Sequence, residues 1–257
     1  AGPCNSYQQG SNAALLKTNR MWAAAAMLYA TGDSTYETAF QRDYVTVDGI
    51  SSFDKTEAFA ASLYLRVQAG ASPATQSAIR QQLLALADGV RADAAAHPYQ
   101  FATAYYWGCT SNGMHRSGQF SWRAYALDTT RLADRDQGLM NLDYIFGRNF
   151  YHLCFVSGID GVTNGRMHGF HHWMKALNTS PWHFPGALSS GPNQAPEAND
   201  VSYPNAQPYP ILGYWGDPAN PRNTSTPVDG RFTDNDSWST NEVAINWNAA
   251  LLYSLYA

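Results

Sequence analysis

The sequence predicts an all-α fold, and three observations support this prediction. Apolar residues recur at helical spacing through roughly the first 150 residues, capping residues and glycines bound these stretches, and no alternating strand pattern competes over them. Roughly five helices of about ten to seventeen residues, joined by loops of medium length, are typical of paired antiparallel helices.

The first three predicted helices cover residues 21–33, 53–70 and 72–89. All three have a glycine at or next to their end, and glycine readily takes the left-handed conformation that closes a helix. Asp54 and Glu57 form a capping box at the start of the second helix. Ser72 caps the third helix, Pro73 suits its first turn, and Gly89 is expected to stop it.

Two further helices are predicted at 111–128 and 131–147. Gly118 interrupts the first of them, because glycine is a poor helix former. The second places three apolar residues on one side of the helix: Leu139, Leu142 and Ile145.

The character of the chain changes after Gly147. Residues 149–238 hold most of the 13 prolines together with clustered His, Trp and Asn, and a loop region of this length in a compact domain is usually functional. The prediction is part of one domain over residues 1–257. It has a helical scaffold at 14–147, long site-bearing loops at 148–240 and a closing helix at 241–256.

Composition narrows the possible ligands. Charged residues make up 14% of the chain and the net charge is −4, which argues against a nucleic acid or an anionic membrane as partner. No apolar run is long enough to span a membrane. Aromatic residues also make up 14%, with 8 Trp and 16 Tyr, which suits a neutral polar ligand such as a sugar or simply a large core. The three cysteines (Cys4, Cys109 and Cys154) lack metal-ligand spacing.

Glu242 stands where an acidic loop meets the closing helix, and two interpretations of it are open. Ser239 and Glu242 fit a capping box, in which Glu242 only holds its own helix start. Alternatively, burial among aromatic rings would raise the pKa of Glu242 and make it a general acid. The neighbours that favour the second interpretation are Asp234, Asp236, Trp238 and Trp247.

Two other clusters are candidates for ligand contacts. His171 and His172 are adjacent and precede Trp173, but adjacent histidines rarely share one zinc ion, so no metal site is predicted. Two roles remain open for these histidines: they bond to sugar hydroxyls, or they belong to a packed loop that contacts no ligand. Tyr106 and Trp107 form either a stacking wall for a sugar ring or a packed corner.

Together these motifs resemble glycoside hydrolase family 9, a family of inverting cellulases with an (α/α)6 barrel. Segments 143–158 and 167–173 are similar to two family motifs, and the closing stretch is similar to a family signature. The signature positions in this chain are Phe232, Asp234, Trp238, Asn241, Glu242, Ala244, Asn248 and Ala249.

The resemblance implies an (α/α)6 barrel of which this chain covers roughly the C-terminal half to two-thirds. It implies a secreted enzyme that cleaves β-1,4-glucan with inversion, with Glu242 as proton donor and Asp234 or Asp236 orienting the site. The sugar-binding residues that it implies are His171, His172, Trp173, Tyr106, Trp107 and Trp238.

Three departures from the family pattern shape the expectations. The motif that carries the family's catalytic base is absent, so the partners expected are a polysaccharide or oligosaccharide and the N-terminal part of the same catalytic domain. Trp173 stands where the family has an arginine, which weakens the case for ordinary cellulose. Thr18, Asn19 and Arg20 stand where family members often bind calcium, so no cofactor is predicted.

Three rival functions remain open at this stage. One is an exo-acting β-glycosidase on an amino-sugar oligomer, which Trp173 would suit. Another is a degenerate domain that binds carbohydrate without cleaving it. The third is an all-helical interaction scaffold that binds no saccharide.

Overall fold

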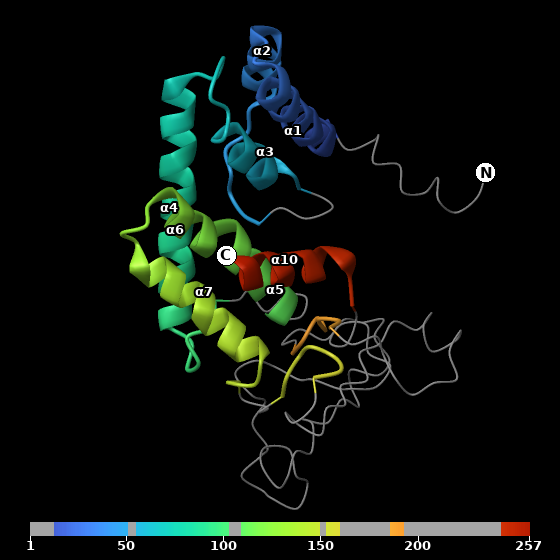
Figure 1. The fold of residues 1–257 in the computed structure, drawn as a ribbon, viewed down its shortest axis with the longest axis vertical. Coiled ribbons are helices and arrows are strands. Elements are labelled where there is room, and N and C mark those ends of the chain that lie inside the picture. The colour runs from blue at the N-terminus through green and yellow to red at the C-terminus, as the bar shows by residue number, and fades with distance from the viewer. Residues whose placement is uncertain (1–12, 51–54, 103–108, 150–152, 160–185, 193–242) are drawn as a thin grey trace, which may run out of the picture. The chain divides into compact units, whose positions relative to one another are not determined.

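The computed structural model describes residues 13–50, 55–102, 109–149, 153–159, 186–192 and 243–257. It divides into two compact units, Ala1–Asp88 and Gly89–Ala257. Within the described ranges the regular elements are helices (Figure 1), and the β-structure there consists of two isolated bridges between non-helical segments. None of the described helices is both long and apolar enough to cross a membrane.

The first unit contains α1 (Ala13–Thr31), α2 (Ser34–Asp43), α3 (Glu57–Tyr64) and most of α4 (Pro73–Ala95). Helix α1 packs against both α2 and α3 and buries Met21 and Leu28 completely. It ends as predicted at Gly32, which has a φ of +68° and donates its backbone N–H to the carbonyl of Leu28 at 2.8 Å.

Helix α2 was not among the predicted helices. Asp33 begins it by accepting a hydrogen bond from the N–H of Thr35 at 2.8 Å, and this bond lowers the pKa of Asp33. A short polar segment with few apolar residues carries little periodicity, so only the cap residue marks it in the sequence.

Helix α3 is shorter than predicted, because it begins at Glu57 and ends at Tyr64 rather than near Gly70. Its N-cap is Thr56, whose side chain makes no capping bond, and the predicted cap residue Asp54 lies outside the described residues. The side-chain amide of Gln76 donates to the carbonyls of Tyr64 and Val67, at 3.3 and 2.8 Å. This amide from α4 satisfies carbonyls that a longer helix would have used.

Helix α4 confirms the predicted cap and contradicts the predicted stop. The hydroxyl of Ser72 accepts a hydrogen bond from the N–H of Thr75 at 3.3 Å, and Pro73 is the first helical residue. Gly89 does not end the helix, which continues to Ala95. The reason is a buried stripe that continues past Gly89 at helical spacing: Ile79, Leu83, Ala87, Val90 and Ala94.

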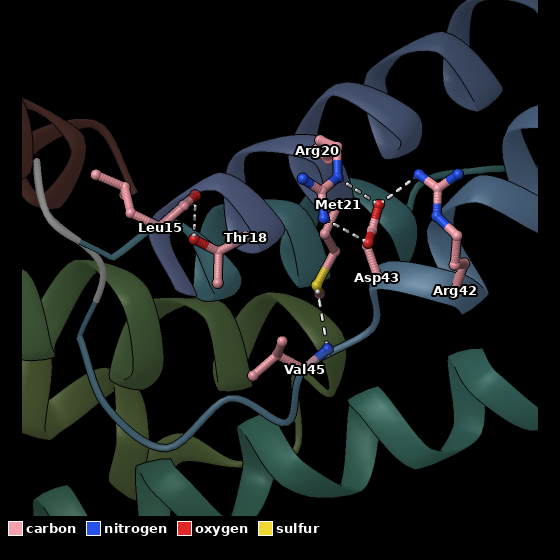
Figure 2. A network of polar contacts seen from close by, with 7 residues as sticks. All are labelled: Leu15, Thr18, Arg20, Met21, Arg42, Asp43 and Val45. Carbon is pink, nitrogen blue, oxygen red and sulfur yellow. Dashed lines mark hydrogen bonds and ion pairs between the residues drawn. The ribbon is translucent and has the colours of Figure 1, made fainter. Parts of the chain in front are cut away.

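A buried carboxylate links the middle of α1 to the end of α2 (Figure 2). Asp43 is 3% exposed and accepts two hydrogen bonds from Arg20, both at 3.0 Å, and one from Arg42 at 2.6 Å. These two guanidinium groups hold the pKa of Asp43 well below its usual range. Beside this network the sulfur of Met21 accepts a hydrogen bond from the N–H of Val45 at 3.4 Å.

The second unit contains α5 (Cys109–Arg116), the π-helix η3 (Ser117–Ser121), α6 (Trp122–Leu127), α7 (Leu132–Ile145) and α10 (Ile245–Tyr256). Gly118 does not break the helix as predicted: it lies in a π-helical turn that joins α5 to α6, so the chain stays helical and only the α-helical hydrogen-bond pattern changes there. Helix α10 packs against α5, η3 and α7.

The buried face of α7 differs from the predicted apolar side. Leu139 is 45% exposed, whereas Ile145 is buried as predicted. The polar side chain of Asp134 is also fully buried, and it accepts hydrogen bonds from Arg91 and Arg131, each at 2.5 Å. Apolar periodicity could not identify this face because a paired carboxylate occupies part of it.

The closing helix begins later than predicted. Helix α10 starts at Ile245, and its N-cap is Ala244 in an extended conformation. Ser239 is therefore not the N-cap of α10, and Glu242 is not at the third position of this helix as the capping box required. Of the predicted residue pair, neither Ser239 nor Glu242 lies within the described ranges.

Candidate active site

The predicted site residues all lie outside the described residues, so the structure neither brings them together nor separates them. They are Tyr106, Trp107, His171, His172, Trp173, Asp234, Asp236, Trp238 and Glu242. Described residues that flank the segments carrying them do meet in space, and they define the surroundings of the candidate site.

Three short segments form the bridge frame, which consists of residues 153–159, 186–192 and 243–244. Val156 pairs with Leu188 in an antiparallel β-bridge, and Ser189 pairs with Val243 in another. Figure 1 shows the first segment in yellow, the second in orange and the last at the start of red α10. Backbone bonds reinforce the frame: Ser189 donates to the carbonyl of Phe155 at 3.0 Å.

The bridge frame supplies the acceptors that the start of α5 needs. The first N–H groups of a helix have no partner within the helix. Here the N–H of Cys109 donates to the carbonyl of Pro192 at 2.8 Å, and that of Thr110 donates to the carbonyl of Ser190 at 3.0 Å. The hydroxyl of Thr110 also donates to the carbonyl of Ser189. The chain that follows Tyr106 and Trp107 is thus fixed to the frame as soon as it becomes helical.

The frame is also joined to the end of α7. The N–H of Phe155 donates to the carbonyl of Ile145 at 2.8 Å. The side-chain amide of Asn149 is fully buried and donates to the carbonyls of Tyr144 and Leu153, at 2.7 and 2.6 Å. These bonds satisfy the last carbonyls of α7 and set the direction in which the chain enters the frame.

An apolar core supports the bridge frame. The rings of Phe101 and Tyr144 stack with their centroids 3.8 Å apart. The hydroxyl of Tyr144 lies 3.6 Å from the sulfur of Cys109. Around these rings pack further buried residues from all parts of the unit: Met114, Ile145, Leu153, Cys154, Phe155, Val156, Leu188, Trp247 and Leu251. Close packing of this kind gives the frame a single arrangement.

Burial shifts the pKa values of two titratable groups near the frame. His115 in α5 is 5% exposed, and burial lowers its pKa against a smaller opposite effect of a hydrogen bond with the backbone of Asn246. Burial likewise raises the pKa of the Cys154 thiol. Both groups therefore favour their neutral forms, and neither supplies a charge to the frame.

The described part of the frame carries no acidic side chain, since it consists of LCFVSGI, GALSSGP and VA. It can therefore hold catalytic groups in place but cannot itself donate or accept the protons of a hydrolysis. The acids that could do so adjoin it: Glu242 is covalently joined to Val243, and Asp234 and Asp236 precede it on the same segment.

Thr18, Asn19 and Arg20, which stand where family members often bind calcium, all make contacts within the protein. The side chain of Asn19 accepts a hydrogen bond from the hydroxyl of Thr56 at 3.1 Å, and Thr18 donates to the carbonyl of Leu15 at 3.1 Å (Figure 2). Arg20 places a cation there and pairs with Asp43. Calcium requires six to eight oxygen ligands. Over the described ranges no group of three or more His, Cys, Asp or Glu side chains could hold a metal ion.

Comparison with known proteins assigns the family. The family model described as glycosyl hydrolase family 9 matches residues 2–255. The chain belongs to glycosyl hydrolase family 9. Among curated relatives of this family 9 chain, a xyloglucan-specific endo-β-1,4-glucanase from Bacteroides ovatus is 28% identical over 90% of this chain and 37% of its own length. Endoglucanase D from Acetivibrio thermocellus is 26% identical over 92% of this chain and 33% of its own length. The family 9 chain thus spans about a third of the length of these two curated relatives.

Solved structures confirm the predicted fold class. A thermostable endoglucanase from Alicyclobacillus acidocaldarius aligns with 93% of this family 9 chain at a TM-score of 0.73 and 23% identity, covering 42% of that structure. The family 9 endoglucanase J30 aligns at a TM-score of 0.75 and 22% identity, covering 41% of that structure. The chain is therefore all-α and forms part of an (α/α)6 barrel.

Sequence reasoning did not find the residues that build the bridge frame of this family 9 chain. The paired residues of each bridge are far apart in sequence, so no local periodicity reveals them. One signal was present at Asn248: an asparagine in the first turn of a helix can bond to the carbonyl four residues earlier, and here that residue is Ala244.

Proposed function

We propose that this chain is the C-terminal part of a glycoside hydrolase domain that cleaves β-1,4-linked glucan with inversion of configuration. The observation that carries the proposal is the family 9 match over residues 2–255, which includes the whole segment from Asp234 to Glu242. The bridge frame supports it, because the segments that carry His171, His172 and Glu242 begin or end there, and Cys109, which follows the segment with Trp107, is hydrogen-bonded to it.

In the proposed mechanism Glu242 donates a proton to the leaving glycosidic oxygen. Inversion needs a second carboxylate about 6.5–9.5 Å from the acid, which activates a water on the opposite face of the sugar ring. The N-terminal part of the domain, on the same polypeptide or on a separate chain, supplies this base. Asp234 or Asp236 orients the site.

Substrate contacts in this proposal come from rings and hydrogen-bonding groups. Tyr106, Trp107 and Trp238 stack against pyranose faces, since aromatic rings bind the apolar faces of sugars. His171 and His172 bond to sugar hydroxyls. Because a glucan polymer is too large to enter a cell, we place the enzyme outside the cell that makes it.

The deciding experiment replaces Glu242 by Gln in the complete catalytic domain. Hydrolysis of β-1,4-glucan should fall by about 10²–10⁴-fold, because the amide cannot donate the proton. Affinity for cello-oligosaccharides, measured by calorimetry, should barely change. The matched control is Asp136→Asn, which removes an exposed acid paired with Arg135 and should leave the rate unchanged. Full activity of Glu242→Gln would refute the proposal.

A second experiment tests the division of the site. The isolated 257-residue chain is expected to release no reducing sugar from β-glucan, and addition of the N-terminal part should restore hydrolysis. Hydrolysis by the isolated chain would mean that Asp234 or Asp236 is the base, contrary to the proposal.

The choice of substrate rests on the relatives and on Trp173. One relative is named as xyloglucan-specific, so xyloglucan and carboxymethyl cellulose are the first substrates to compare. Trp173 is the specific observation that favours the alternative, an exo-acting enzyme on an amino-sugar oligomer. Activity on chitosan with none on either glucan would support this alternative, and saccharide binding without cleavage would indicate a degenerate binding domain.

A further inference from the structure

Asn248 in the first turn of α10 makes two side-chain hydrogen bonds of opposite kinds. Its carbonyl oxygen accepts the N–H of Leu188 at 2.9 Å, and its amide nitrogen donates to the carbonyl of Ala244 at 2.8 Å. Only a side chain with both a donor and an acceptor can make this pair of bonds. The backbone N–H of Asn248 also donates to the carbonyl of Ala244, at 3.2 Å.

These bonds close a ring with the second β-bridge of the frame. Leu188 precedes Ser189, which pairs with Val243, and Val243 precedes Ala244. Asn248 therefore ties both sides of that bridge to α10: one bond holds the segment 186–192, and the other holds the end of the segment that comes from Glu242. The ring fixes the backbone at the residue that immediately follows Glu242.

A purely local role would not need both bonds. An asparagine that only steadied its helix start would bond to the carbonyl of Ala244 and leave the other end of its amide to solvent. The bond to Leu188 reaches a segment outside the helix and far away in sequence. It stabilises the frame rather than the helix.

We propose that Asn248 is a positioning residue for Glu242, an inference that rests on the function proposed above. A general acid must lie within hydrogen-bond reach of the leaving oxygen, and a displacement of about 1 Å can cost about 10²-fold in rate. Asn248 touches neither substrate nor reacting atoms. It acts through the backbone of residues 243 and 244.

The test uses the complete catalytic domain and two substrates that differ only in the leaving group. Cellobiosides with a poor leaving group depend on proton donation, whereas those with a dinitrophenolate leaving group do not. Asn248→Ala should lower kcat on the first by about 10–100-fold, with KM within a few-fold, and leave hydrolysis of the second nearly unchanged. Asn248→Asp keeps the acceptor for Leu188 and loses the donor to Ala244. Its kcat on the substrate with the poor leaving group should lie between those of the wild type and Asn248→Ala.

The matched control is Asn246→Ala, two residues earlier on the same helix, which should leave both rates unchanged. An equal loss of kcat on both substrates, or no loss on either, would overturn the inference. If Asn248→Ala does not fold, the same comparison is made with Asn248→Asp. Failure of the underlying function has a different signature, because Glu242→Gln would then retain its activity on the poor leaving group.

Hydrogen exchange provides a check that needs no catalysis. In the 257-residue chain, the amide of Leu188 should exchange about 10-fold or more faster in Asn248→Ala than in Asn246→Ala. Unchanged protection of this amide would show that Asn248 does not hold the segment, and the inference would be abandoned.

Discussion

Gly113 in α5 offers the sharpest test of how tightly the core beneath the bridge frame is packed. A methyl group added at Gly113 would lie 2.3 Å from the outermost carbon of the Phe101 ring. That ring is 1% exposed and stacks on Tyr144 with centroids 3.8 Å apart, so it has no room to retreat. Gly113→Ala must therefore displace a ring that supports the frame.

The expected magnitude is the difference between two opposing effects. Replacing glycine by alanine inside a helix gains about 1 kcal/mol of helix stability. Overpacking of a buried site costs about 1–3 kcal/mol, and the short contact with an immobile ring places Gly113→Ala at the upper end. The free energy of unfolding should fall by about 2 kcal/mol net, which corresponds to a Tm lower by about 4–8 °C.

The assay is urea and thermal unfolding followed by circular dichroism and tryptophan fluorescence. Gly89→Ala is the matched control, since Gly89 lies within α4 and nothing is found within 4 Å of its added methyl group. It should stabilise the chain by about 0.5–1 kcal/mol, the opposite sign. A Gly113→Ala variant as stable as the wild type would refute the packing argument. Adding Phe101→Leu to Gly113→Ala should relieve part of the loss.

Two further predictions concern buried titratable groups. Asp43→Asn should lower the free energy of unfolding at pH 7 by about 2 kcal/mol, less than is usual for a buried pair, because Arg20 and Arg42 are 53% and 65% exposed and can return to water. The lowered pKa of Asp43 means that its contribution is present above about pH 4 and is lost as the pH falls toward its folded pKa, so urea titrations should show the two proteins converging below pH 4. In a Cys4→Ser background, the buried thiols of Cys109 and Cys154 should react with a disulfide reagent only as fast as the chain opens, because burial shields both sulfurs in the folded state and raises the pKa of Cys154 there. Rapid labelling in the absence of urea would contradict the burial of both thiols.

The helices show which parts of the fold were predictable from local sequence. Gly32 and the Ser72–Pro73 pair marked real helix boundaries, because a left-handed residue and a capping hydroxyl act on their immediate neighbours. Gly89 gave a false stop, since the buried stripe of α4 outweighs the cost of one glycine. Helix α2 was missed because its stability depends on packing against α1, which no local window contains.

For the candidate site, the sequence could suggest which residues belong to it but not which segments pair to hold it. The resemblance to family 9 proposes Glu242 and its neighbours as the acids of the site, and this stays a prediction because they lie outside the described residues. Motif spacing could not find the pairing of Ser189 with Val243 or the bond from Leu188 to Asn248, because these join segments that are distant along the chain. The start of α10 was placed too early for the same reason: Val243 pairs with Ser189 and Ala244 is extended, where a capping motif favoured helix.

The bridge frame also bears on how enzymes of this kind diversify. Two long stretches of sequence, 160–185 and 193–242, are each flanked by residues that the frame holds in place. Once such ends are fixed, doubling the length of a connecting segment costs only about 0.6 kcal/mol of chain entropy. Insertions between these points would change the length of the connecting segments while the two bridges stay in register, so under the proposed function substrate preference could diverge without rebuilding the scaffold.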